Sequence, residues 1–311
     1  MTWALVMDVS LAIGLLFLAW QALIGGSLLR GIIMFIVFGM VLAVAWAWLG
    51  SPDLAMAEAA IGAGVTGALI LVAYWRLKRV NAVEPVDPSP LRSTVALVVA
   101  VLGTGLVAAL GLASVAALEG EPVAGQLLNE ALPATGIGNP ITGVLIIFRN
   151  LDTLLEIAVV LAAYVAARAA LGKRQIDLPV PSRDAPLMTA LVTVIAPLAV
   201  LVAIYLLKAG GQTPGGAFQA SALLAALGVM LVLAGRIEST LMVSLWLRLA
   251  LIVGTLVFCL VGLGVMLLGL PLLAIPGTWA VYLIEAAMMV SIAITLVLLF
   301  AGSDGLKGVG R

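Results

Sequence analysis

The sequence predicts an all-α polytopic membrane protein with about nine transmembrane helices, an N-terminus outside the cell and a cytoplasmic C-terminus. Of its 311 residues, 64% are hydrophobic and only 10% are charged, and the mean hydropathy is +1.28. Soluble domains contain roughly 45–50% apolar residues, so a soluble fold is excluded. The apolar residues gather in nine long runs, and basic residues follow every second run.

Each apolar run is long enough to cross a bilayer, which takes about 20 mostly apolar residues in a helix. The predicted spans are 3–24, 28–49, 53–75, 93–118, 140–167, 187–208, 214–235, 243–268 and 278–301. The N-terminus has no basic region or cleavage signal before the first run, which is therefore expected to be a retained span. A short surface helix is expected around 123–132, in an acidic segment.

The basic residues predict the orientation. With nine spans, 13 of the 15 Lys and Arg residues fall on the same side of the membrane as the C-terminus. Basic residues concentrate in cytoplasmic loops, so this side is expected to be the cytoplasm. Two polar, proline-rich linkers on that side, 76–92 and 172–186, indicate joints between units. The chain therefore divides into three spans, then two, then four.

Composition also excludes several kinds of chemistry. The chain has no His and a single Cys, Cys259, which lies in an apolar run. Haem ligation, His/Cys metal sites, Cys–His catalysis and an intrachain disulfide all lack their residues. The net charge of zero offers nothing to attract nucleic acid. No nucleophile–base constellation is evident, so we expect no cofactor, no resident metal and no enzyme active site.

Ionisable residues deep in a membrane are costly and are candidates for function. On a continuous helix, Arg149, Asp152 and Glu156 of the fifth span fall within an arc of roughly 60°. One cation with two carboxylates leaves a carboxylate that can exchange a proton or bind Na⁺ transiently. Glu156, about 18 Å from Arg168 at the inner boundary, is the favoured exchanging group. The alternative is a structural Arg–Asp pair that holds neighbouring helices together.

Two further acids lie inside predicted spans. Glu58 is too far into the third span to cap it, whereas Asp53, near its start, is expected to be a cap. We expect Glu58 to lie on an ion path, with a buried, hydrogen-bonded acid as the alternative. Gly62 and Gly64, which follow it, allow close helix packing or a π-bulge. Glu285, about two turns inside the ninth span, fits both interpretations equally.

The loop 209–219 contains four glycines and a proline, and it predicts a tight turn in which Pro214 begins the next helix. It lacks the Gly-Lys-Ser/Thr ending of a phosphate-binding loop.

Three motifs together resemble a known family. SPDLAMAEAAIGAG, residues 51–64, resembles an element of the small domain at the C-terminal end of the large Mrp antiporter subunit; this domain is a separate subunit in archaeal membrane-bound hydrogenases. NPITGVLIIFRNLDTLLE, residues 139–156, resembles the element that follows it. GGQTPGGAF, residues 210–218, resembles the glycine-rich turn of the B-type Mrp subunit. The three motifs occur in the order of the three predicted units.

The resemblance implies three units joined end to end. Residues 1–80 are similar to the J-type subunit of respiratory complex I and to the D-type hydrogenase subunit, with three helices. Residues 91–171 resemble the E-type hydrogenase subunit, with two helices, and residues 186–302 resemble the B-type Mrp subunit, with four. The acids that match Glu58, Asp152 and Glu156 lie in the region proposed for ion transfer in the family. The usual His of the turn is replaced here, with Gln212 nearby, and the third Gly is Ala217.

The function implied by the resemblance is that of a multi-pass subunit of a Na⁺/H⁺ antiporter in a prokaryotic inner membrane. The expected partners are the large A-type and D-type and the small C-, E-, F- and G-type subunits, the lipid bilayer, Na⁺ and H⁺. Arg149 and Glu285 join Glu58, Asp152 and Glu156 as candidate ion-transfer residues. Two alternatives remain: the same module in a hydrogenase or a related complex I-like oxidoreductase, or a scaffold whose acids are structural.

Overall fold

The computed structural model describes residues 3–24, 26–79, 90–117, 123–171, 186–240, 244–302 and 305–308. Its first half contains α1 (Trp3–Ile24), α2 (Leu28–Trp48), α3 (Pro52–Ala57), η1 (Glu58–Val65), α4 (Thr66–Arg79), α5 (Pro90–Ala117), α6 (Val123–Ala131) and η2 (Leu132–Thr135). The rest contains α7 (Pro140–Thr142), η3 (Gly143–Phe148), α8 (Asn150–Leu171), α9 (Pro186–Ala209), α10 (Ala217–Leu233), β1 (Ile237–Thr240), α11 (Leu245–Gly264), η4 (Val265–Leu268), α12 (Thr278–Ala301) and β2 (Gly305–Gly308).

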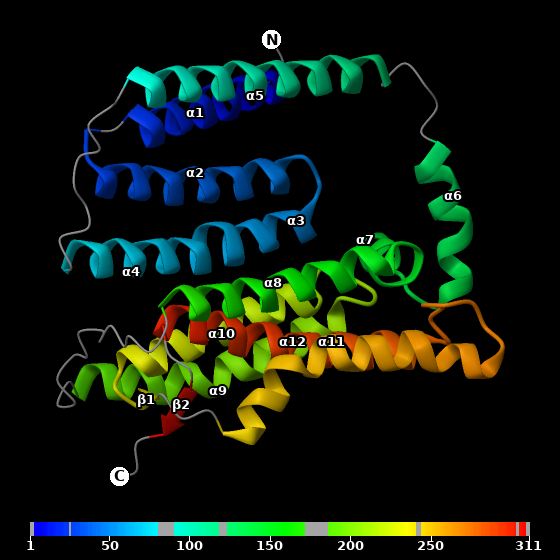
Figure 1. Ribbon diagram of the computed structural model, residues 1–311. Coiled ribbons are helices and arrows are strands. Elements are labelled where there is room, and N and C mark those ends of the chain that lie inside the picture. Colours follow the sequence, from blue (N-terminus) through cyan, green and yellow to red (C-terminus); the bar gives the residue numbers. More distant parts are fainter. Residues whose placement is uncertain are drawn as a thin grey trace.

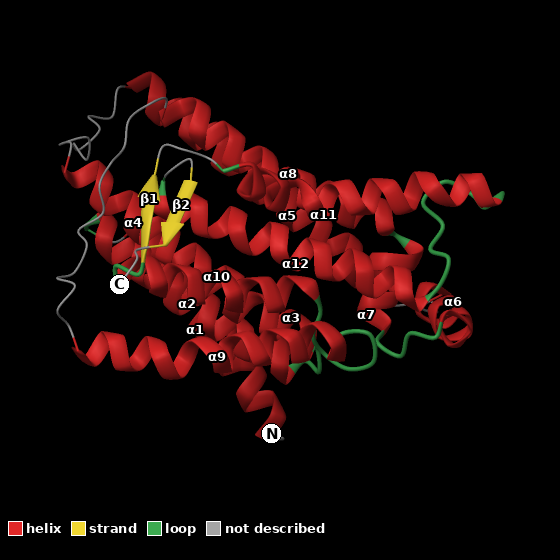
Figure 2. Cartoon of the chain, turned by 90° about the horizontal axis from the view of Figure 1, so that it is seen from below, coloured by secondary structure: helices red, strands yellow, loops and turns green. Residues whose placement is uncertain are grey.

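The long helices lie roughly side by side, and α6 runs crosswise to them at one end (Figures 1 and 2). Within the described ranges, eight helical segments are long and apolar enough to cross a membrane, or nine if a bent pair of helices counts as one span. α10, with 17 residues, reaches the lower end of the usual length of a span. The predicted all-α polytopic fold is confirmed. A short helix is present where one was predicted around 123–132, as α6.

The core of the protein surrounds α12. Most residues of this helix are buried, and it packs chiefly against α10 and α11, with smaller contacts to α4, α8 and α9. In contrast, α1 has no buried residue, and the side chains of α5 from residue 94 to 115 are all exposed. Because all these helices are apolar, the buried ones form the protein interior and the exposed ones present a surface suited to lipid or to other membrane helices.

The third span contains a π-helix at its glycines, as their spacing allowed. η1 joins α3 to α4, and its small residues pack against α2. A Cβ atom placed on Gly39 of α2 would come within 3.2 Å of the Ala63 Cβ, and one on Gly67 would come within 2.8 Å of Ile36 Cγ1. The two backbones can approach this closely only because these residues carry no side chain.

The predicted continuous fifth span over 140–167 is wrong. The π-helix η3 ends at Phe148, and Arg149 has φ −130° and ψ 39°, outside the helical region. The Arg149 amide donates to the Val144 carbonyl at 2.7 Å, which completes the wide turn, and the Asn150 side chain donates to the Leu273 carbonyl. These bonds stabilise the break, so the membrane helix α8 begins only at Asn150.

A two-stranded sheet adds to the predicted all-α fold. β1, after α10, pairs antiparallel with β2, after α12, with Ile237 opposite Gly308 and Thr240 opposite Gly305. The sheet lies at the end of the molecule where α4 and α8 also end (Figure 1). It connects the chain beyond α12 to the loop that follows α10.

Two arginines from other segments bind the C-terminal end of α12. The Arg76 guanidinium, from α4, donates to the carbonyls of Phe300 and Ala301 at 2.7 and 2.8 Å. Arg168, from α8, donates to the carbonyl of Gly302 at 3.1 Å. The last carbonyls of a helix have no partner within the helix and carry a partial negative charge. The two cations therefore stabilise this end of α12 and hold α4 and α8 against it.

Replacing Arg76 with Gln is expected to destabilise the protein, because the Phe300 and Ala301 carbonyls lose a charged donor. Hydrogen bonds to a charged group contribute about 1.5–3 kcal/mol, and thermal unfolding in mild detergent, followed by tryptophan fluorescence, measures the loss. Arg248→Gln, at an exposed position of α11, is the control for loss of one positive charge. Equal midpoints for the two variants would contradict the stabilising role of Arg76.

Candidate functional site

The three motifs of the sequence meet at one buried carboxylate, Asp53. Asp53 lies in the first turn of α3 and is 7% exposed. Its Oδ1 accepts hydrogen bonds from the Gly215 amide at 3.0 Å and from the Asn139 side chain at 3.3 Å. Its backbone carbonyl accepts from the Gln219 side chain at 3.3 Å. Asp53 thus joins α3 to the segment before α7 and to the glycine-rich turn.

Asn139 completes this junction. Its side-chain oxygen accepts from the Ile141 amide at 2.9 Å and caps α7, while its nitrogen donates to Asp53 and to the Thr213 carbonyl at 3.0 Å. The Gly138 amide donates to the Gly211 carbonyl at 2.9 Å. Further bonds run from the Thr142 hydroxyl to the Gly210 carbonyl at 2.6 Å and from the Gln212 side chain to the Gly136 carbonyl at 3.0 Å. The segment 136–142 is therefore bonded to the turn along its whole length.

The glycines of the turn allow this approach. Gly215 and Gly216 have φ of 155° and 119°, values that favour glycine. A Cβ on Gly210 would collide with the Gly216 nitrogen, so no side chain fits there. The prediction that Pro214 begins the next helix is wrong: α10 begins at Ala217, because the backbone of the two glycines is not helical.

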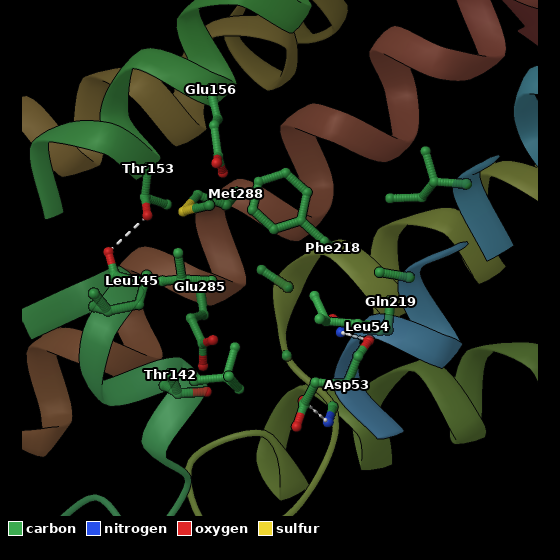
Figure 3. Close-up of a pocket in the computed structure, with 17 residues that line it drawn as sticks. Asp53, Leu54, Thr142, Leu145, Thr153, Glu156, Phe218, Gln219, Glu285 and Met288 are labelled. Atoms are coloured by element: carbon green, nitrogen blue, oxygen red, sulfur yellow. Dashed lines mark hydrogen bonds between the residues drawn. The ribbon is translucent and has the colours of Figure 1, made fainter. Parts of the chain in front are cut away.

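A cavity of about 200 Å³ lies beside this junction and is lined mainly by apolar side chains (Figure 3). Its lining includes three acids from three distant parts of the chain: Asp53 of α3, Glu156 of α8 and Glu285 of α12. The neutral polar side chains that line it are Thr142, Thr153 and Gln219. Among the described residues that line it, none is Lys or Arg. The cavity therefore gathers negative charge and polar oxygen atoms inside an apolar surrounding.

Glu285 is the most deeply buried of the three acids, at 3% exposure. Its carboxylate lies at the N-terminus of α10, beside the Ala217 amide. A Cβ on Gly216 would lie 3.2 Å from Glu285 Oε1, so the absence of a side chain there makes room for the carboxylate. Its other oxygen, Oε2, is buried and has no hydrogen-bond partner among the described residues. Such an atom is costly unless water or an ion completes it.

Glu156 reaches the same cavity from another side and is more exposed than Glu285. In the view of Figure 3, the side chain of Met288 lies between the two carboxyl groups, and the Phe218 ring lies to one side of them. Thr153, one turn before Glu156, uses its hydroxyl to bond the Leu145 carbonyl at 2.6 Å. The part of the cavity between Glu156 and Glu285 is therefore mainly apolar.

The structure separates the other predicted site residues from this cavity. Arg149 and Asp152 form an ion pair at 2.7 Å, with 69% of the arginine side chain and 45% of the aspartate side chain exposed. The helix predicted to carry all three residues is interrupted before α8, so Arg149 lies outside it, whereas Asp152 and Glu156 remain one turn apart on α8. Of the three, only Glu156 lines the cavity. Glu58 does not line the cavity and lies at the start of η1, with its Oε1 against Gly39 and Gly62.

The sequence analysis missed Asp53 as a site residue. Its place in the first turn of a helix favoured a capping role, and no local pattern showed that its oxygen accepts bonds from Asn139 and Gly215. One sequence feature could have indicated it: each of the three family-like motifs contains a proline of the kind that begins helices, next to a turn. These prolines are Pro52, Pro140 and Pro214. Such motifs bring polar groups to the same end of several helices.

The fold and the cavity define a class: a polytopic membrane protein that gathers carboxyl groups from separate segments into one cavity within its helical bundle. Comparisons make this more specific. Residues 13–79 match the MbhD family model, which describes the D subunit of MBH. Residues 187–303 match the model of a domain related to the MnhB subunit of Na⁺/H⁺ antiporter. No curated protein matches the chain by sequence.

A solved structure shares the fold. The Mrp complex from Dietzia sp. DQ12-45-1b aligns with a TM-score of 0.67 and 22% sequence identity, over 94% of this chain. The alignment covers 34% of that chain, so this protein spans about a third of its length. Two separate parts of the chain thus match the MbhD model and the MnhB-related model, and the predicted resemblance is confirmed.

Replacing Asp53 with Asn is expected to loosen the junction. The amide oxygen can keep the two bonds that Oδ1 accepts, but the NH2 group that replaces Oδ2 then faces the Asn139 NH2 group, 3.5 Å away from Oδ2 in the wild type. An unsatisfied buried donor costs about 1–3 kcal/mol. Thermal unfolding in detergent measures the loss, and Glu130→Gln on the exposed face of α6 is the matched neutralisation. If the two variants unfolded at the same temperature, the charge of Asp53 would contribute nothing to the junction.

Proposed function

We propose that the chain is a membrane subunit of a multisubunit antiporter that exchanges Na⁺ for protons. The single observation that carries this proposal is the cavity that collects Asp53, Glu156 and Glu285 with no Lys or Arg among the described residues of its lining. Carboxyl groups at membrane depth are costly and typically mark ion or proton pathways. The match of residues 187–303 to a domain related to an antiporter subunit supports the same function.

In this proposal Glu156 and Glu285 exchange ions or protons, because both line the cavity and its described lining offers neither of them a basic partner. Glu58, packed against Gly39, continues the path toward α2. Arg149 and Asp152 form a solvent-accessible ion pair at the start of α8. Such pairs are weak, so either side chain can leave its partner to bind a passing ion. Each of these five roles rests on position and charge.

The chain is expected to act with other subunits rather than as an enzyme or a lone transporter. It spans about a third of the Mrp chain with which it aligns. The proposed partners are the large A-type and D-type subunits and the small C-, E-, F- and G-type subunits. We place the complex in a prokaryotic inner membrane, with the helix ends that carry Arg76 and Arg168 facing the cytoplasm.

We also propose that the polypeptide combines three units, 1–80, 91–171 and 186–302. Residues 13–79 and 187–303 match separate family models. α5 makes few contacts with the rest of the described chain, whereas α8 packs against α11 and α12. Within the proposed middle unit, α8 therefore packs against the third unit, whereas α5 presents its apolar surface outward.

A second function is favoured by one observation, the match of residues 13–79 to the MbhD family model. In this alternative the same cavity belongs to a membrane subunit of a hydrogenase or a related complex I-like oxidoreductase. The chemistry of ion transfer within the cavity is the same in both cases, and the partners differ.

Glu156→Gln is expected to abolish Na⁺-driven proton movement in everted membrane vesicles while the complex still assembles. The amide keeps the shape of the side chain but cannot exchange a proton. Vesicles are assayed by the fluorescence of a pH-sensitive dye after addition of Na⁺, and assembly is checked on native gels. Glu130→Gln serves as control; unchanged transport in the Glu156 variant would remove this residue from the pathway.

Purification of the tagged chain from its native membrane in mild detergent is expected to bring large antiporter-like subunits with it, identified by mass spectrometry. Co-purified nickel–iron or iron–sulfur subunits would assign the chain to a redox complex instead. A chain that purifies alone, under conditions in which a known membrane complex stays intact, would contradict both functions.

A further inference from the structure

We propose that Glu285, Gln219 and Thr142 form a binding site for one dehydrated monovalent cation of the size of Na⁺. This inference rests on the proposed function and deepens it, because it assigns the transported cation to a definite set of oxygen atoms. Neither Arg149 nor Asp152 lines the cavity, and the fold alone brings the three side chains of the proposed site to it.

The first argument is the state of the Glu285 carboxylate. The side chain is buried, lines the cavity and leaves Oε2 without a partner among the described residues. In Figure 3 its carboxyl group points toward Thr142. A buried oxygen without a protein partner, next to a cavity, is a position that an ion or a water molecule can complete.

The second argument is the arrangement of neutral oxygens around it. Gln219 donates its nitrogen to the Asp53 carbonyl at 3.3 Å, which turns its Oε1 toward Gly216. Glu285 Oε1 and Gln219 Oε1 lie 3.2 and 3.5 Å from the same point, where a Cβ on Gly216 would stand. The Thr142 hydroxyl gives its proton to the Gly210 carbonyl at 2.6 Å. Its oxygen lone pairs are therefore free to face a cation.

The third argument is charge. The described lining of the cavity contains no Lys or Arg, and Asp53 is already engaged by the Gly215 amide and the Asn139 side chain. For Glu285, the N-terminus of α10 offers only about half a positive charge. An ionised Glu285 thus needs a cation to balance it.

The same set of ligands favours a monovalent ion. Protein sites for Ca²⁺ typically draw on several carboxylates among six to eight oxygens. Among the described residues, no group of three or more His, Cys, Asp or Glu side chains is placed to hold a metal ion. One carboxylate with neutral oxygens balances a single charge and suits a hard, oxygen-seeking cation.

The test is the thermal unfolding of the intact purified complex in detergent, titrated with NaCl at constant ionic strength against choline chloride. Bound Na⁺ stabilises the folded state by mass action, so the wild-type midpoint is expected to rise and saturate. Glu285→Gln is expected to abolish the rise. Thr142→Val and Gln219→Leu are expected to shift the half-saturating Na⁺ concentration upward by roughly tenfold or more, and Glu130→Gln is expected to leave it unchanged.

Glu285→Asp, which keeps the charge on a shorter side chain, guards against a variant that fails to fold. It is expected to retain a saturable rise with weaker affinity. The proposal is overturned if the midpoint rises equally with Na⁺ in the wild type and in Glu285→Gln. It is also overturned if the wild-type midpoint responds to pH but not to Na⁺, because Glu285 would then bind only a proton. The readout is binding, so a complex that binds Na⁺ through Glu285 but exchanges no protons would contradict the proposed function alone.

Discussion

The packing of the helices around the cavity depends on how the carboxylates of Asp53 and Glu285 are accommodated in an apolar interior. Burial of a charge is tolerated only where hydrogen-bond donors and opposite charge offset the lost hydration. Backbone amides near helix starts have this role here: the Gly215 amide donates to Asp53, and the Ala217 amide lies beside Glu285. These amides belong to one glycine-rich turn, so a single loop serves two acids that come from opposite ends of the chain.

The long helices are then held together at both of their ends. At one end, Asp53 and Asn139 connect α3, α7 and the glycine-rich turn by hydrogen bonds. At the other end, Arg76 and Arg168 bind the last carbonyls of α12. Glu285 lies on α12 between these two sets of bonds. The position of the Glu285 carboxylate in the cavity therefore depends on contacts near both ends of α12. These contacts connect the cavity to α3 and α7 at one end and to α4 and α8 at the other.

Several features of the site could be predicted from the sequence, and others could not. Glu285 and Glu156 were recognisable because an acid in an apolar run is rare and costly wherever the helix packs. The π-helix was recognisable because Gly62 and Gly64 interrupt a helix next to an acid. The break at Arg149 was not, since it is stabilised by a bond from Asn150 to the distant Leu273. Asp53 was assigned to capping because its partners lie far away in the sequence.

The sequence by itself determined the membrane class, the existence of the spans and the family-like motifs, since hydropathy and local spacing depend only on neighbouring residues. Only the tertiary structure decided which acids share a cavity. Asp53, Glu156 and Glu285 come together there, while Glu58 and the Arg149–Asp152 pair lie apart. The physical reason is that a helix has several faces and each buried polar group needs a partner. The face that turns inward is therefore decided by packing and hydrogen bonds between segments that are distant in the chain.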